Sequence, residues 1–165
     1  MVSSLGEGSH WKGWAMNTDQ DRGGLSDAAY EEARRVFYAA PFAADLGLVL
    51  ERLAVGECET SLKILPRHLQ QDGFVHAGVQ ASLADHTAGG AAATLLVEGK
   101  IVLSIEFKIN LLRPAKGDVL SCRAKVLKGG RQVTVAEAEV YAVTGEKESL
   151  VSKATVTLAN VSLNA

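Results

Sequence analysis

Apolar and polar residues alternate in six stretches of this chain, and a period of two predicts β-strands. The stretches cover about residues 46–55, 58–65, 101–112, 118–128, 131–143 and 150–159. Residues 129 and 130 are both glycine, which predicts a tight hairpin turn with positive φ. A single alternation through the third stretch puts an apolar set on one face and a polar set on the other: Ile101, Leu103, Ile105, Phe107 and Ile109 against Ser104, Glu106, Lys108 and Asn110. In the last stretch the residues predicted to face inward are Leu150, Ala154, Val156 and Leu158.

Two further stretches predict helices. Ser26 is a suitable N-cap for a helix that Pro41 stops, and a short turn over residues 41–45 follows. The second helix covers about residues 77–97 and consists largely of alanine and glycine. Gly89 and Gly90 each cost a helix about 1 kcal/mol relative to alanine, so close approach of another backbone must favour them. We expect a sheet wrapped around this helix, or a symmetry mate docked on it.

Together these elements predict an α+β fold, in which an antiparallel sheet of five or six strands is covered by one long helix. Residues 1–25 lack periodicity and are expected to form a flexible tail, followed by a single domain over residues 26–165. One helix cannot cover both faces and both edges of such a sheet. We therefore expect the chain to pair with itself as a homodimer or homotetramer.

Composition narrows the class of partner. The formal net charge is −2 with a pI near 6.1, so no basic field for nucleic acid is present and a small molecule is expected. Without an apolar run of bilayer length or a secretory leader, a soluble cytoplasmic protein is expected, with no membrane association. Cys58 and Cys122 lie outside any metal-ligand motif, which predicts buried free thiols and no metal site. Motifs of serine hydrolases, nucleotide binders and zinc proteases are absent from the sequence.

One stretch carries a recognisable signature. Gly73-x-x-His76-Ala77-Gly78 is followed by Leu83-Ala84-Asp85, and residues 104–117 read S-I-E-F-K-I-N-L-L-R-P-A-K-G. This resembles the G-x-x-H-G-G and L-A-D signature of hotdog-fold acyl-CoA thioesterases of the phenylacetate-degradation type. The resemblance implies a hotdog fold with active sites at a dimer interface. It also implies hydrolysis of acyl-CoA to free acid and coenzyme A, with no cofactor beyond the coenzyme A of the substrate.

The resemblance also implies roles for individual residues. Asp85 matches the helix carboxylate that acts as nucleophile or as general base on water. The backbone N–H of Ala77 matches the donor to the thioester carbonyl, although alanine replaces the usual glycine. Gln70 matches an amide that orients the water or the thioester, and His76 is expected to hydrogen-bond backbone near the helix start. Ser104 matches a strand hydroxyl that assists from the neighbouring subunit, although simple alternation groups it with polar residues.

Further residues are candidates for binding the substrate. An acyl pocket is expected from residues of a neighbouring subunit together with residues of the signature, namely Phe74, Gly78, Val79 and Leu83. Basic residues at two predicted strand turns are candidates to meet the phosphates of coenzyme A, namely Arg113, Lys116, Lys128 and Arg131. Aryl and medium-chain acyl groups both remain open. Two alternatives also remain: a hotdog hydratase or dehydratase, whose D-x-N-P-x-H motif is absent, and a non-catalytic acyl-CoA sensor.

Overall fold

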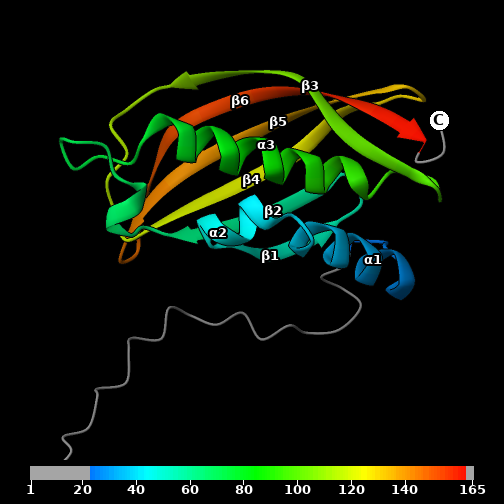
Figure 1. Cartoon of the computed structure of the whole chain (residues 1–165), viewed down its shortest axis with the longest axis horizontal. Coiled ribbons are helices and arrows are strands. Elements are labelled where there is room, and N and C mark those ends of the chain that lie inside the picture. Colours follow the sequence, from blue (N-terminus) through cyan, green and yellow to red (C-terminus); the bar gives the residue numbers. More distant parts are fainter. Residues whose placement is uncertain (1–22, 163–165) are drawn as a thin grey trace, which may run out of the picture.

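The computed structural model describes residues 23–162, so most of the predicted N-terminal tail lies outside the described residues. Its centre is a six-stranded antiparallel sheet with the order β1-β2-β4-β5-β6-β3 (Figure 1). The strands are β1 Leu48–Ala54, β2 Glu57–Lys63, β3 Lys100–Leu111, β4 Val119–Gly129, β5 Val133–Thr144 and β6 Lys147–Ser162. This confirms the predicted α+β class, and β3 and β1 form the two edges of the sheet.

Helix α3 (Ala77–Ala93) lies across one face of the curved sheet and contacts every strand (Figure 1). Half of its buried residues are alanine, namely Ala84, Ala88, Ala91 and Ala92, as the alanine-rich sequence predicted. The helix ends about one turn before residue 97, because Thr94 folds back on it. The Thr94 hydroxyl donates to the Ala91 carbonyl and accepts the N–H of Gly56, each at 2.7 Å. A curved sheet packed around one long helix is the hotdog arrangement that the sequence resemblance implies.

Two short helices precede the sheet. Helix α1 (Asp27–Tyr38) is capped by Ser26, whose Oγ accepts the N–H of Ala29 at 3.3 Å. Pro41 was predicted to lead into a turn, but it starts helix α2 (Pro41–Leu46). Proline suits the first position of a helix, because its N–H is not needed there and its φ is already helical. The prediction of a turn over residues 41–45 was therefore wrong.

A bulge changes which residues of β3 face the helix. The register against β6 shifts between Ser104 and Glu106, so Ile105 has no partner in the ladder. One extra residue reverses the alternation. Val102 before the bulge and Ile109 after it both pack against the core, and Ser104 lies on this same face. The predicted grouping of Ser104 with Glu106, Lys108 and Asn110 was therefore wrong.

Two other predictions were also wrong, one about the turn after β4 and one about an inward-facing residue of β6. Gly129 ends β4 opposite Thr134 and lacks positive φ, so the predicted two-residue turn is absent. Gly130 is needed for space instead, since a Cβ there would lie 2.5 Å from the Val133 carbonyl oxygen. In β6, a second register shift sets Leu150 opposite Tyr141, and Val151 is buried in place of Leu150.

Gly90 lies where α3 packs closely on the sheet. A Cβ on this residue would lie 2.9 Å from the Sγ of Cys58, which is below contact distance. Gly90→Ala is therefore expected to lower the free energy of unfolding by about 1–3 kcal/mol, the usual cost of overpacking a core. Urea denaturation followed by circular dichroism measures this change.

Cys58→Ala provides the matched background for that test. The Cys58 Cβ would remain at 3.6 Å from the new methyl group, an ordinary contact. In this background Gly90→Ala is expected to cost little, or to stabilise by up to about 1 kcal/mol through helix propensity. An equal loss in both backgrounds would show that Cys58 does not limit the space.

Candidate active site

The start of α3 leaves one backbone donor unused. His76 is the N-cap, and its Nδ1 accepts the N–H of Gly78 at 2.9 Å, while its carbonyl accepts the N–H groups of Val79 and Gln80. The N–H of Ala77 has no partner among residues 23–162. Ala77 is the first residue of the helix, and helical geometry accommodates its Cβ. This exposed N–H, at the positive end of the helix dipole, suits an oxyanion.

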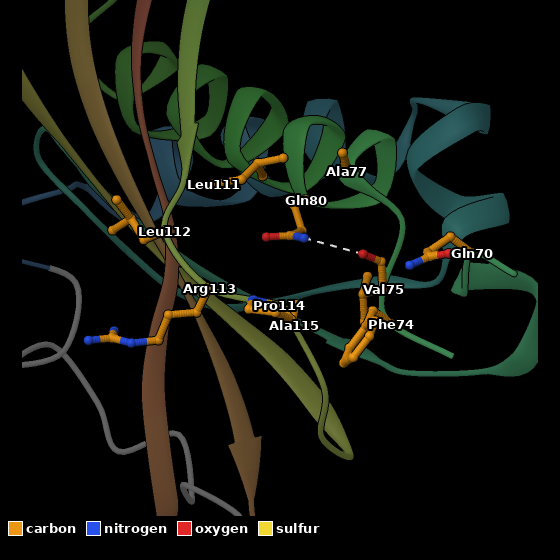
Figure 2. Close-up of a pocket in the computed structure, with 10 residues that line it drawn as sticks. All are labelled: Gln70, Phe74, Val75, Ala77, Gln80, Leu111, Leu112, Arg113, Pro114 and Ala115. Atoms are coloured by element: carbon orange, nitrogen blue, oxygen red, sulfur yellow. Dashed lines mark hydrogen bonds between the residues drawn. The ribbon is translucent and has the colours of Figure 1, made fainter. Parts of the chain in front are cut away.

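A pocket of about 390 Å³ lies beside this donor, between the start of α3 and the end of β3 (Figure 2). It brings together four of the residues singled out in the sequence: Gln70, Phe74, Ala77 and Arg113. The Oε1 of Gln70 accepts the N–H of Asp72 at 2.9 Å, which orients the side-chain amide. The remaining lining residues are Val75, Gln80, Leu111, Leu112, Pro114 and Ala115.

Asp85 and Ser104 form a second group. The Ser104 Oγ donates a hydrogen bond to Asp85 Oδ1 at 2.7 Å and so joins α3 to the edge strand β3. This contact exists because the bulge at Ile105 turns Ser104 towards the helix. The half-buried carboxylate keeps its other oxygen available. Asp85 can therefore act on a ligand while Ser104 holds its orientation.

One copy of the chain does not bring these two groups together. Asp85 follows Ala77 by eight residues on the same helix, and a rise of about 1.5 Å per residue separates their backbones by about 12 Å along the axis. Neither Asp85 nor Ser104 lines the pocket. Each copy thus carries two separate groups of candidate residues, which we name the oxyanion half-site (Gln70, Phe74 and Ala77) and the carboxylate half-site (Asp85 and Ser104).

Comparison with known proteins assigns the family. Residues 72–149 match the family model described as the thioesterase superfamily. A solved thioesterase family protein from Silicibacter pomeroyi is 36% identical, with a TM-score of 0.79, and the match covers 81% of this chain and 98% of that one. The chain belongs to the thioesterase superfamily. It is therefore a thioester hydrolase with the hotdog fold.

Other members of the superfamily are more distant. The medium/long-chain acyl-CoA thioesterase YigI of Escherichia coli is 27% identical, over 73% of this chain and 85% of its own. PaaI, from the phenylacetic acid degradation operon of E. coli, has a TM-score of 0.74 at 22% identity, covering 83% of this chain and 96% of that one. The likeness to PaaI shows the shared hotdog fold. The hotdog thioesterase resemblance drawn from the signature is thus confirmed.

The residues predicted to line the acyl pocket of this thioesterase lie in different surroundings within one copy. Phe74 lines the pocket beside Ala77, whereas Val79 and Leu83 are buried in the hydrophobic core. Gly78 uses its N–H on the ring of His76. Sequence reasoning missed Gln80, although a glutamine among the core positions of a helix is a signal that it reaches something polar.

The four basic residues fall into two separate pairs. Arg113 and Lys116 lie in the segment between β3 and β4, which forms part of the pocket wall. Arg113 also donates to the Leu150 carbonyl at 2.7 Å. Lys128 and Arg131 lie at the opposite end of β4 and in the turn after it. Within one copy, the two pairs cannot meet the same phosphate group.

Two other histidines in the described part of the chain, His68 and His86, make structural contacts. His68 is buried, and its Nδ1 accepts the N–H of Leu65 at 3.1 Å. The ring of His86 packs on Phe37 with centroids 4.4 Å apart, and its Nε2 lies 3.3 Å from the Phe37 carbonyl oxygen. Burial lowers the pKa of both imidazoles. They are therefore neutral at physiological pH, and His86 is directed to Phe37.

The two cysteines are free and buried, as predicted. Burial raises the pKa of both thiols, that of Cys122 to about 12. Neither is a thiolate nucleophile at neutral pH. Across residues 23–162, no cluster of three metal-binding side chains occurs. In that same range, no helix has the length and apolar character needed to cross a bilayer.

Proposed function

We propose that this thioesterase hydrolyses acyl-CoA esters in a site built by two copies of the chain. One copy supplies the oxyanion half-site and the other supplies the carboxylate half-site. The observation that carries this proposal is the separation of about 12 Å along one helix between the Ala77 N–H and Asp85. A reacting carbonyl must lie near both its donor and its attacking group, so a second copy has to complete the site.

The edge of the sheet beside Asp85 supports pairing. Strand β3 has a free edge, and several of its apolar side chains are about half exposed: Leu103, Ile105, Phe107 and Leu111. Such an edge invites association with another strand. Because β3 carries Ser104, a second copy that covers this edge would also approach the carboxylate half-site. This supports a homodimer, or a tetramer made from it.

Each half-site has a defined chemical role in this proposal. The Ala77 N–H donates to the thioester carbonyl oxygen and stabilises the charge that develops on it. Gln70 orients the thioester or the water through its side-chain amide. Asp85 either attacks the carbonyl carbon or removes a proton from an attacking water. Ser104 holds the carboxylate in place, and the products are the free acid and the thiol of coenzyme A.

The two ends of the substrate are the phosphates of coenzyme A and the acyl group. Arg113 and Lys116 flank the pocket and are proposed to meet the phosphates of coenzyme A, whereas Lys128 and Arg131 remain candidates from the sequence. The names of relatives point to different acyl groups, since YigI is a medium/long-chain enzyme and PaaI comes from a phenylacetic acid operon. Both aryl and aliphatic esters therefore belong in the test.

The direct test is release of free coenzyme A thiol from a panel of aryl-CoA and straight-chain acyl-CoA esters. Turnover of at least one ester by the purified wild-type protein is expected. If no ester is hydrolysed while several bind, the protein is an acyl-CoA sensor rather than an esterase. Formation of a hydrated or dehydrated acyl-CoA without thiol release would instead indicate a hydratase or dehydratase.

Mixing two inactive variants tests the two-copy site. Asp85→Asn disables the carboxylate half-site and Ala77→Pro disables the oxyanion half-site. When the two variants are co-expressed, about half of randomly formed dimers are mixed, and one of the two sites in each mixed dimer is intact. Recovery of about a quarter of wild-type activity is expected. No recovery in purified mixed dimers would show that both half-sites act within one copy.

A further inference from the structure

His68 is the only buried residue between positions 66 and 74, just ahead of α3. Only 1% of it is exposed, whereas Gln70, two residues later, is half-buried and lines the pocket. A surface loop positions a functional side chain well only when a rigid anchor holds the loop. The buried ring of His68 is such an anchor, because the rest of this stretch is exposed or half-buried.

The ring of His68 fixes the short turn that leads into the loop. Pro66–His68 form a single turn of 3₁₀ helix, and His68 Nδ1 accepts the N–H of Leu65 at 3.1 Å. Nδ1 can accept only in the neutral ring that carries its proton on Nε2, and burial keeps the ring neutral by lowering its pKa. Nε2 has no hydrogen-bond partner among residues 23–162. The bond from Leu65 therefore orients the ring, and the ring sets the direction in which the chain leaves the turn.

The backbone of His68 ties the same point to the start of α3. Its carbonyl accepts the N–H of His76, the N-cap of that helix, at 2.9 Å. Residues 69–75 form the loop between them, which we name the Gln70 loop. The N–H of Gln70 donates across this loop to the Phe74 carbonyl at 2.8 Å, and Figure 2 shows Gln70 beside the helix start. Both ends of the Gln70 loop thus meet at His68.

Resting on the proposed function, we propose that His68 is a positioning residue for the hydrolysis, which sets the amide of Gln70 against the Ala77 donor. A thioester can use both groups only when each lies within hydrogen-bond reach, and a misplacement of about 1 Å can cost about 100-fold in rate. Ala77 belongs to α3 and keeps its place when the loop moves. Loss of the Nδ1 bond therefore acts on the reaction through Gln70.

Two variants separate the hydrogen bond of the ring from its bulk. Asparagine places an oxygen where His68 has Nδ1 and can accept the N–H of Leu65, whereas glutamine places its polar atoms where Nε2 lies and leaves that N–H unpaired. His68→Gln is expected to lower kcat by about 10- to 100-fold on the best ester of the panel, with a smaller change in KM. His68→Asn is expected to keep kcat within about threefold of wild type. Circular dichroism checks that both variants are folded.

The Gln70→Ala background shows which group His68 acts through. Gln70→Ala is expected to lower kcat by itself, and adding His68→Gln should then lower it by less than about threefold further, because residues that act as a unit are not additive. A residue that only stabilises the fold would cost the same in both backgrounds. An undiminished loss in the Gln70→Ala background would overturn the inference. So would wild-type activity of folded His68→Gln, or equal losses in His68→Asn and His68→Gln.

Native-state hydrogen exchange of the wild type tests the anchor without any variant. The N–H groups of Leu65, Gln70 and His76 are expected to share one free energy of opening, because the ring, the loop and the helix start separate together. A different value for Leu65 would show that the ring does not hold the loop. This measurement decides the question if His68→Gln does not fold. If no ester is hydrolysed, the proposed function fails, and the exchange data still show whether His68 anchors the Gln70 loop.

Discussion

Asp85→Asn is expected to lower kcat by about 100- to 10,000-fold, the range for loss of a general acid or base. Asparagine has nearly the shape of aspartate, and its oxygen can still accept the hydroxyl of Ser104, which lies 2.7 Å from Asp85 Oδ1. A neutral amide can neither attack a thioester nor take a proton from water. The rate is measured by thiol release, using the best ester of the panel.

Two controls accompany this variant. Asp45→Asn makes the same chemical change on α2, outside the pocket and both half-sites, and is expected to keep the wild-type rate. Circular dichroism should show that Asp85→Asn retains the wild-type fold. If Asp85→Asn keeps more than about a tenth of the wild-type rate, the carboxylate is not the attacking or activating group.

Isotope labelling separates the two possible roles of Asp85, general base and nucleophile. In a single turnover in water labelled with heavy oxygen, a general base would direct labelled water to the carbonyl, and the free acid would carry label. A nucleophilic Asp85 would contribute its own oxygen first. Its attack expels the coenzyme A thiolate and forms a mixed anhydride, which water then opens. Attack of water on the Asp85 carbonyl carbon would release unlabelled acid and put label in the Asp85 carboxylate, an outcome that a general base cannot give.

Ala77→Pro is expected to lower kcat by about 100- to 1,000-fold, the usual loss for one oxyanion-hole donor. Proline lacks the backbone N–H proposed to bind the carbonyl oxygen. The fold should tolerate the change, because Ala77 is exposed, is the first residue of α3 and has an N–H without a hydrogen-bond partner within residues 23–162. Proline is favoured at this helix position. His76 already has φ −58° and ψ 140°, which suits a residue before proline.

The matched control is Ala77→Gly, which keeps the N–H and restores the glycine usual in the resembled signature. Its rate is expected to stay within about threefold of wild type, because the backbone donor is unchanged. Thermal unfolding should show that both variants are folded. Equal loss in the proline and glycine variants would mean that the Ala77 methyl group, and not its N–H, is what the reaction needs.

The features predicted correctly from the sequence are those that neighbouring residues in the chain determine. The strands were found because their period of two is written in consecutive residues. The long helix was found because its alanine-rich composition is equally a property of neighbouring residues. The motif around His76 and Asp85 was found in the same way, since its spacing along one helix is a matter of sequence. Pro41 was misjudged because proline both ends one helix and begins another.

The bulge in β3 could not be predicted from the alternation of apolar and polar residues. Nothing in the alternation of residues 101–112 marks Ile105 as the unpaired residue, because the bulge is defined only against β6. Yet it decides that Ser104 meets Asp85. Val79 and Leu83 show the same limit, since several faces of α3 are apolar or small, and only the wrapped sheet determines that these two residues lie in the core.

Fold class and the identity of the chemical groups were therefore available from the order of residues, because propensity, periodicity and motif spacing are properties of neighbours in the chain. The grouping of those residues was not. The pairing of Asp85 with Ser104 and the pocket beside Ala77 both join segments distant in sequence. Such contacts arise when the sheet closes around the helix, so the folded chain alone determines them.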